Sequence, residues 1–157
     1  MTLQFRLMNA VGLALCIGCS TYAATAHAAL GAAYSSVETD RIHLSAKIKS
    51  TAAATYTAHA LTLANGGVVT ELTRPDGMVF AVTWRGPGRP DLRQLLGSHF
   101  DTLQADNATR VGRRIRRPMV VNRADFIVQT GGHSGAFWGV ALLPQMEPAG
   151  FSANDLK

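Results

Sequence analysis

The chain has 157 residues, of which 47% are hydrophobic and 16% are charged, and its formal net charge is +5. The length suits one domain, and the composition is that of a globular chain, which excludes an intrinsically disordered protein. No apolar stretch reaches the roughly 18 residues of a membrane span, which excludes a polytopic membrane protein, and two cysteines are too few for a disulfide framework or a four-cysteine zinc site.

The first 28 residues have the pattern of a secretory signal peptide. Arg6 supplies the positive charge, residues 10–19 form a short apolar segment, and Ala26-His27-Ala28 is an A-x-A cleavage site. We therefore predict that residues 1–28 direct export and are then removed.

Residues 29–157 are predicted to form a single exported domain, periplasmic or secreted, with no cysteine and no transmembrane span. Two alternatives concern its anchoring. A retained N-terminal anchor needs a longer apolar run than residues 10–19 provide. A lipid anchor at Cys19 follows if residues 17–19 end a lipobox, and it would tie the domain to a membrane.

The beginning of this domain is rich in Ala, Ser and Thr. Ser35 and Glu38 have the spacing of a capping box, which is compatible with a short helix over roughly 36–48. A three-stranded meander is predicted next, with strands at 55–63, 68–73 and 78–84.

The meander is marked by its turns. Asn65-Gly66 favours a two-residue hairpin turn, because a type I′ turn requires positive φ at both positions, and a turn centred there puts His59 opposite Leu72. In the third strand, period-two alternation predicts one shared face for Met78, Phe80, Val82 and Trp84.

A helix is predicted after the proline- and glycine-rich segment 85–90. Asp91 is its N-cap, with Gln94 at the capping-box position. Its buried side is predicted from the residues at helical spacing, which are Leu92, Leu95, Leu96, His99 and Leu103.

The C-terminal part is predicted to be a β-hairpin, with strands at 119–130 and 136–143 around a glycine-rich turn at 131–135. The order of elements therefore predicts an α+β fold with a small antiparallel meander of three strands, one amphipathic helix and a C-terminal β-hairpin.

A set of motifs lies in order along nearly the whole domain: Ala29-Leu30-Gly31, Asp76-Gly77, Val79-Phe80-Ala81-Val82, Trp84, Gly86-Pro87, Pro90-Asp91-Leu92, Leu95-Leu96-Gly97, Phe100, Gly131-Gly132-His133, Gly135-Ala136-Phe137, Gly139, Pro148, Gly150 and Asp155. With this set the chain resembles the domain of unknown function 2844 family of small exported proteobacterial proteins. The resemblance implies a small secreted or periplasmic domain, and it implies no activity.

The glycine-rich turn holds two candidate ligand-binding residues, His133 and Ser134. Ser134 does not fit a nucleophile elbow, because the fifth residue of that motif is Ala136 here and a strand, not a helix, is predicted to follow. We predict a hairpin turn. Ligand binding by His133, or a small hydrolase that uses His133 with Ser134 or a carboxylate, is the alternative.

Five arginines lie within eight residues: Arg110, Arg113, Arg114, Arg116 and Arg117. A solvated loop and an anion site for an acidic polymer or a lipid headgroup are the two interpretations. No aromatic residue interleaves the run, so bases would have no stacking platform, and nucleic acid is not predicted as a partner.

No metal, cofactor or catalytic set is predicted. The histidines of the domain lack the spacing of a zinc pair, and His59 and His99 are predicted to meet in the core as hydrogen-bonded neutral imidazoles, with a metal or acid–base pair as the alternative. Trp84 and Trp138 are predicted to pack against the sheet, with a sugar-binding surface as the alternative.

These observations favour a non-catalytic binding or interaction module of the bacterial envelope or the secreted space, with a protein of that compartment as a candidate partner. The two alternatives are the small hydrolase at His133 and anionic polymer or lipid-headgroup binding through the arginine run, which spans 110–117.

Overall fold

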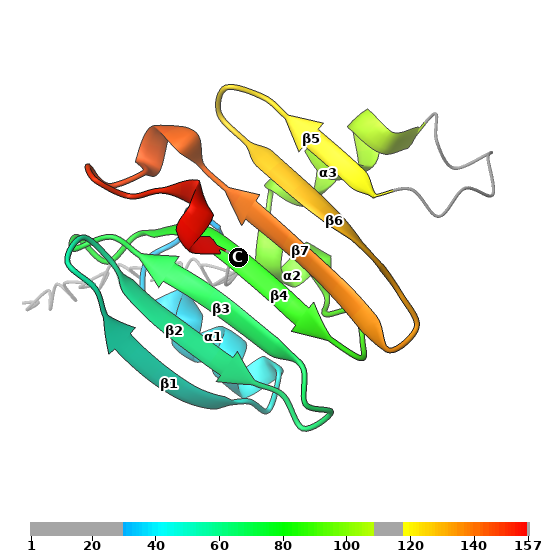
Figure 1. The fold of residues 1–157 in the computed structure, drawn as a ribbon, viewed down its shortest axis with the longest axis horizontal. Helices are drawn as coiled ribbons and strands as arrows, with labels where there is room; N and C mark the ends of the chain where they lie inside the picture. The colour runs from blue at the N-terminus through cyan, green and yellow to red at the C-terminus, as the bar shows by residue number, and fades with distance from the viewer. Residues whose placement is uncertain (1–29, 109–117, 157) are drawn as a thin grey trace, which may run out of the picture.

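Seven strands form one antiparallel sheet, in the order β1-β2-β3-β4-β7-β6-β5 (Figure 1). The computed structural model describes residues 30–108 and 118–156, so the predicted signal peptide and the arginine run lie outside the described residues. The strands are β1 (Lys47–Ala52), β2 (Thr57–Thr62), β3 (Val68–Thr73), β4 (Val79–Gly86), β5 (Met119–Asn122), β6 (Ile127–His133) and β7 (Ala136–Leu142).

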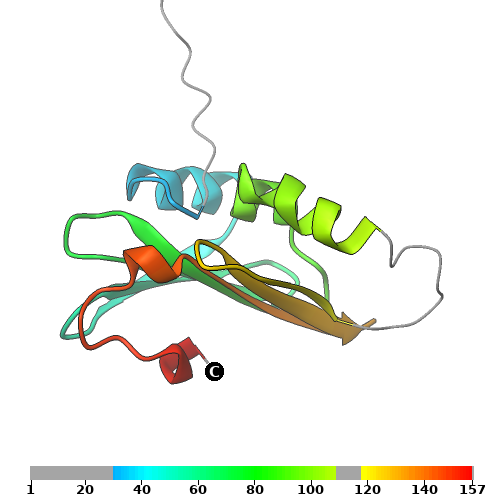
Figure 2. The same cartoon turned by 90° about the horizontal axis from the view of Figure 1, so that it is seen from above.

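Helices cover one face of this sheet, and the C-terminal segment lies on the other (Figure 2). The helices are α1 (Ser35–His43), α2 (Leu92–Leu96) and α3 (His99–Asn107). The C-terminal segment, called the tail below (144–156), contains the short 3₁₀ helices η2 (Pro144–Met146) and η3 (Ala153–Leu156). We call the two sides of the sheet the helix face and the tail face.

Apolar side chains are buried on both faces. The larger cluster lies on the helix face, where Val37 of α1, Leu95 of α2 and Leu103 of α3 pack on the sheet. The smaller cluster lies on the tail face, where Leu72 and other strand residues pack against Phe151 and its neighbours in the tail. The tail therefore covers only part of its face.

The predicted three-strand meander with one helix and a separate hairpin is wrong, because β4 pairs with β7 and joins both parts into a single sheet. The register runs from Ala81 opposite Leu142 to Gly86 opposite Phe137. Alternation within each segment identifies a strand, but it does not reveal which distant strand lies beside it. The α+β content is confirmed, with more strand than predicted.

The first strand, β1, is missing from the prediction, which places a helix as far as residue 48. Helix α1 ends at His43, and Ser45 then adopts a left-handed conformation with φ of 48°. Every residue of β1 is exposed, so no apolar alternation marks it. Lys47 and Lys49 are typical of an edge strand, where charges oppose pairing with another chain.

Two further predicted elements are divided. The helix that begins after Asp91 breaks at Gly97, where φ is 52°, into α2 and α3. The strand predicted at 119–130 is two strands, β5 and β6, and β6 continues through the glycines to His133. Asp91 is an N-cap as predicted: its Oδ1 accepts hydrogen bonds from the backbone N–H groups of Arg93 and Gln94, at 2.9 and 3.2 Å.

The single face predicted for Met78, Phe80, Val82 and Trp84 is interrupted. A register shift between Leu72 and Thr73 leaves Phe80 as an extra residue in β4. Such a bulge reverses the alternation on one side of it. Phe80 therefore packs in the tail-face cluster, whereas Val82 and Trp84 pack under the helices.

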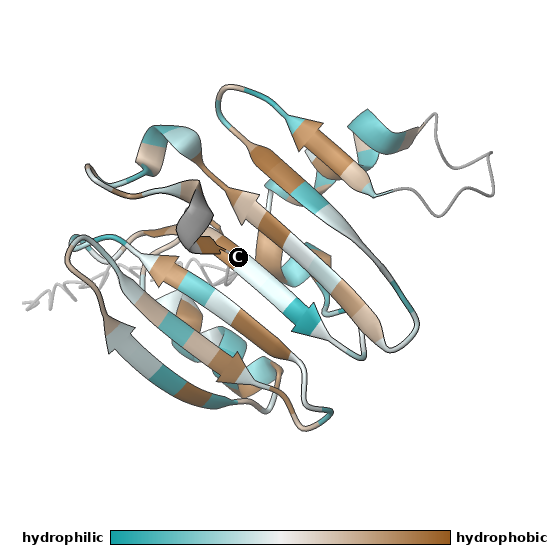
Figure 3. Cartoon of the chain, in the orientation of Figure 1, coloured by the Kyte–Doolittle hydropathy of each residue, from teal (hydrophilic) through white to brown (hydrophobic). Residues whose placement is uncertain are grey.

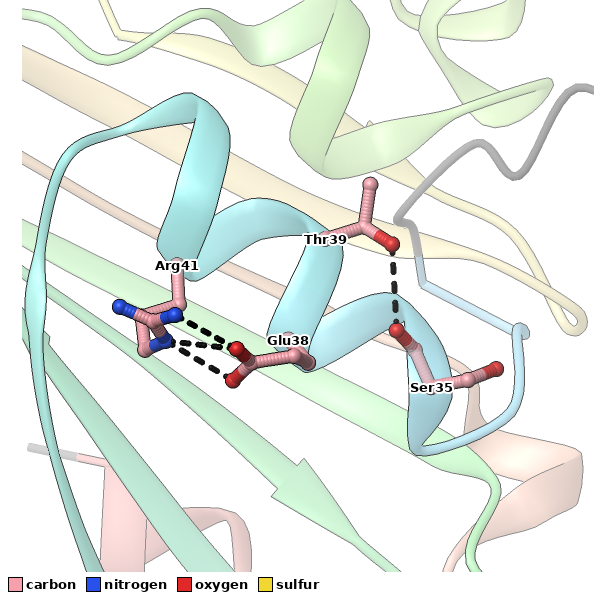
Figure 4. Close-up of polar contacts among 4 residues, drawn as sticks. All are labelled: Ser35, Glu38, Thr39 and Arg41. Atoms are coloured by element: carbon pink, nitrogen blue, oxygen red, sulfur yellow. Dashed lines mark hydrogen bonds and ion pairs between the residues drawn. The ribbon is translucent and has the colours of Figure 1, made fainter.

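Figure 4 shows why the predicted capping box does not form at the start of α1. Tyr34, not Ser35, is the N-cap residue, and it has no side-chain capping bond. Glu38 instead pairs with Arg41, whose Nε lies 2.9 and 2.8 Å from the two carboxylate oxygens. Because the two side chains are 35% and 51% exposed to water, this pair adds little to the stability of the helix.

Candidate binding site

Part of the tail face is not covered by the tail. Register pairs place one row of side chains across five strands on this face: Lys47, Thr62, Val68, Arg85 and Trp138. The next row on the same face contains Lys49, Ala60, Thr70, Thr83 and Val140. The third row, with Leu72, Ala81 and Leu142, belongs to the apolar cluster beneath the tail. We call the first two rows the open surface.

The views agree on this arrangement. In Figure 1 the tail lies over the upper left part of the sheet and ends near its centre, and the ends of β4 and β7 at the lower right are left uncovered. Figure 2 shows the tail projecting from the sheet on the side opposite the helices. The open surface is therefore a strip of sheet with the tail beside it.

A shallow cleft of about 430 Å³ opens at the end of this strip. The backbone N–H of Gly135, in the β6–β7 turn, donates a hydrogen bond of 3.2 Å to the carbonyl of Pro87, which joins two of its walls. The cleft is lined by Gly66, Val68, Arg85, Gly86, Pro87, Gly135, Ala136, Phe137 and Trp138.

The two tryptophans lie on opposite faces of the sheet. Trp84 is 3% exposed and packs under the helices, whereas Trp138 is 40% exposed on the open surface. A Cβ atom on Gly131, the register partner of Trp138, would lie 3.2 Å from the indole Cζ2, so this ring packs directly on the glycine backbone. The indole of Trp138 is thus held against the sheet while much of its surface is available to a ligand.

The open surface has positive charge and no carboxylate. Lys47, Lys49 and Arg85 are exposed, and none forms an ion pair with a carboxylate in the part of the chain that the structure describes. No Asp or Glu occurs in its two rows. Four other arginines do form ion pairs, namely Arg41, Arg74, Arg93 and Arg123. Arg89, beside the cleft, lies over the ring of Phe137 at 5.2 Å from its centroid.

The predicted residues His133 and Ser134 lie at the rim of this cleft. His133 is the last residue of β6 and pairs with Ala136, which lines the cleft, while Ser134 begins the turn. Nδ1 of His133 lies 2.9 Å from the backbone carbonyl oxygen of Ser134. Across 30–108 and 118–156, no carboxylate is hydrogen-bonded to His133 to orient it as a base.

The arginine-run candidates Arg113, Arg114, Arg116 and Arg117 lie outside the described residues. The structure therefore places His133 and Ser134 next to residues that line the cleft, and the arginine run stays a prediction. The sequence analysis did not identify three residues of the open surface, namely Arg85 and the two lysines of β1. A β1–β2–β3–β4 meander recognised from the sequence would have aligned them, because register partners share a face.

A second polar group lies buried on the helix face. Asp40 of α1 is 0% exposed and Glu71 of β3 is 1% exposed. The side-chain amide of Gln94 in α2 donates a hydrogen bond to Oδ1 of Asp40. As ionised groups, the second oxygen of Asp40 and both oxygens of Glu71 have no hydrogen-bond donor among the described side chains.

One proton shared between the two carboxyl groups supplies the missing donor. Burial, together with the neighbouring Asp40 charge, raises the pKa of Glu71 to about 9, and burial also raises the pKa of Asp40, although Gln94 and His43 act in the opposite direction. The protonated Glu71 can then donate to Asp40. This arrangement ties α1 to β3 and is closed to a ligand, so it holds the fold together.

His59 lies next to this pair and is a core imidazole. Its Nδ1 lies 2.8 Å from the hydroxyl of Ser50, its Nε2 lies 3.0 Å from the hydroxyl of Thr73, and burial lowers its pKa. Its register partner is Glu71, not the predicted Leu72. The cause is a three-residue loop: the N–H of Leu63 bonds to the carbonyl of Gly67, which shifts the hairpin by one residue.

His99, the other predicted core histidine, does not meet His59. Its ring stacks on Phe126 with centroids 4.7 Å apart, and burial lowers its pKa. No group of three or more metal-ligating side chains occurs in 30–108 and 118–156. In the same ranges no helix is long and apolar enough to cross a membrane.

Comparison with known proteins identifies a family. Residues 26–156 match the family described as Protein of unknown function (DUF2844), which confirms the resemblance noted from the sequence motifs. No curated protein and no solved structure matches the chain.

Proposed function

We propose that this chain, which belongs to the DUF2844 family of proteins of unknown function, is an exported, non-catalytic binding module. Its ligand occupies the open surface and the adjoining cleft. The observation that carries this proposal is the 40% exposed indole of Trp138, which is seated on Gly131 next to Arg85, whose guanidinium forms no ion pair with a carboxylate of the described residues.

Exposing such a ring to water has a cost in free energy. The tail covers the apolar side chains on the neighbouring part of this face, but the indole of Trp138 leaves apolar surface in water. A cleft lined by exposed backbone, an aromatic ring and a cation offers hydrogen bonds, an apolar platform and a charge to one ligand.

Export is the part of the proposal that rests on residues 1–28 alone, through Arg6, the apolar segment and the Ala26-His27-Ala28 cleavage site. The absence of catalysis is supported by His133, whose Nδ1 faces the carbonyl of its own turn and has no orienting carboxylate among the described residues.

The test uses protein expressed as the full chain with a C-terminal tag. Its intrinsic fluorescence is titrated with a panel of neutral and acidic oligosaccharides and charged peptides. We expect at least one class to change the emission of Trp138 without being consumed, and Trp138→Ala to abolish the binding of that class as measured by calorimetry. Ile42→Ala, which removes an exposed apolar side chain of α1, is the matched control and is expected to bind normally. Equal binding by the Trp138→Ala protein would place the site elsewhere.

A further inference from the structure

We infer that the ligand of the open surface is an acidic polysaccharide whose chain crosses the strands from Trp138 toward β1. This inference rests on the proposed function and adds the chemical class and the direction of the ligand. It stands on the positions of Arg85, Lys47 and Lys49 relative to Trp138.

The spacing of the cations requires an extended ligand. Lys47 and Arg85 belong to one row but lie three strands apart, which is roughly 14 Å at the usual spacing between neighbouring strands. One small anion cannot contact both. A chain with negative charges at intervals can contact Arg85, Lys47 and Lys49 in turn.

The sign of the charge follows from what the surface lacks. Its two rows contain three cations and no carboxylate, so a neutral ligand would leave all three charges uncompensated. Guanidinium and ammonium groups pair with carboxylate through charge-assisted hydrogen bonds, and complementary charge also speeds the encounter.

The groups between the cations indicate a ligand rich in hydroxyls. Thr62, Thr70 and Thr83 present hydroxyl groups between Lys47 and Trp138, and each hydroxyl both donates and accepts. Trp138 supplies a single aromatic platform. A nucleic acid strand would need several such platforms for successive bases, and the two rows offer one.

The tail disfavours a lipid surface. It projects from the sheet on the same side as the open surface (Figure 2), so a planar membrane that approached this face would also meet the tail. A single polymer chain can lie on the strip beside the tail. Among polyanions, an acidic polysaccharide therefore fits the geometry and the chemistry of this surface together.

The experiment measures the affinity of the tagged full-length protein for oligogalacturonate by calorimetry. The methyl-esterified form of the same oligosaccharide is the neutral counterpart. We expect the esterified form to bind about tenfold more weakly, since one charge-assisted contact corresponds to about that factor. The affinity for the acidic form should fall as salt is raised.

Variants locate the contact. Arg85→Gln and the double variant Lys47→Gln/Lys49→Gln should each weaken oligogalacturonate binding about three- to tenfold. Arg93→Gln removes the same charge from an exposed position of α2, on the opposite face, and should bind as the parent does. Thermal melting verifies that each variant is folded.

The outcomes separate the two proposals. If the esterified oligosaccharide binds as tightly as the acid, the binding module stands and the acidic class is wrong. If a thymidine oligonucleotide or a phosphatidylglycerol vesicle binds more tightly than oligogalacturonate, the polysaccharide class is also wrong. If the Arg85 and lysine variants bind unchanged, the chain does not cross this surface. If no ligand of the panel perturbs Trp138, the proposed function fails as well.

Discussion

The indole of Trp84 lies against Gly139 of the neighbouring strand so closely that a Cβ atom on Gly139 would meet Cζ2 of the ring at 2.1 Å. The two residues are register partners, and both are buried on the helix face. Gly139 therefore serves the close approach of a ring to the backbone. Trp138 and Gly131 repeat this relationship on the tail face. A Cβ atom on Gly131 would lie 3.2 Å from Cζ2 of Trp138, whose ring is exposed.

Gly139→Ala is expected to destabilise the protein by about 1–3 kcal/mol, because an added methyl group overpacks a core that cannot move. Gly131→Ala should cost less, since the exposed ring of Trp138 can shift outward, and it should change the emission of that tryptophan. Chemical denaturation measures both losses. An equal loss of unfolding free energy in the two variants would contradict the claim that Trp84 is held more tightly than Trp138.

Fluorescence quenching tests the charge around Trp138. The exposed ring lies beside Arg85, so iodide should quench its emission more efficiently than caesium, whereas Trp84 should be protected from both. Arg85→Gln should reduce quenching by iodide, and Arg93→Gln should leave it unchanged. Equal quenching by the anion and the cation in the parent protein would argue against a positive surface.

The buried pair of Asp40 and Glu71 predicts a pH dependence of stability. Below the ordinary pKa of 4.5, Glu71 holds its proton in both states; between 4.5 and about 9 the unfolded chain has released it and the native state has not. The free energy of unfolding should therefore fall across this range, with a contribution of up to about 1.4 kcal/mol per pH unit. The raised pKa of Asp40 acts in the same direction.

Glu71→Gln isolates this effect. The amide fits the same space and can donate to Asp40, so the variant should be more stable than the parent, by a margin that grows from pH 4.5 toward pH 9. Glu147→Gln, in the exposed part of the tail, is the control. Parallel stability curves for the parent and Glu71→Gln would show that Glu71 is ionised in the native state.

How much of this could be predicted from the sequence depends on the range of the interactions. The N-cap at Asp91 and the three strands of the meander follow from local chemistry, and they are present. The helix divides at Gly97, where φ is 52°. The continuation of β6 through Gly131 depends on packing, since Trp138 of the next strand lies against Gly131. The strand propensity of a segment does not indicate that a side chain of another strand packs on it.

The buried pair shows the same limit at the scale of one residue. A two-residue turn at Asn65-Gly66 would put Leu72 opposite His59, whereas the three-residue loop ending before Gly67 puts Glu71 there. One step of register exchanges the two faces of a strand. In the sequence, the second glycine at position 67 was the feature that could have indicated the longer loop. The open surface required, in addition, the pairing of β4 with β7, which places Arg85 beside Trp138.

The most direct test of the binding surface is the indole N–H region of a nitrogen–proton NMR spectrum. The chain contains two tryptophans, which lie on opposite faces of the sheet, so one signal reports the open surface and the other is an internal control. On titration with oligogalacturonate, we predict that the Trp138 signal shifts and the Trp84 signal does not. A Trp138 signal that stays in place while calorimetry reports binding would contradict it.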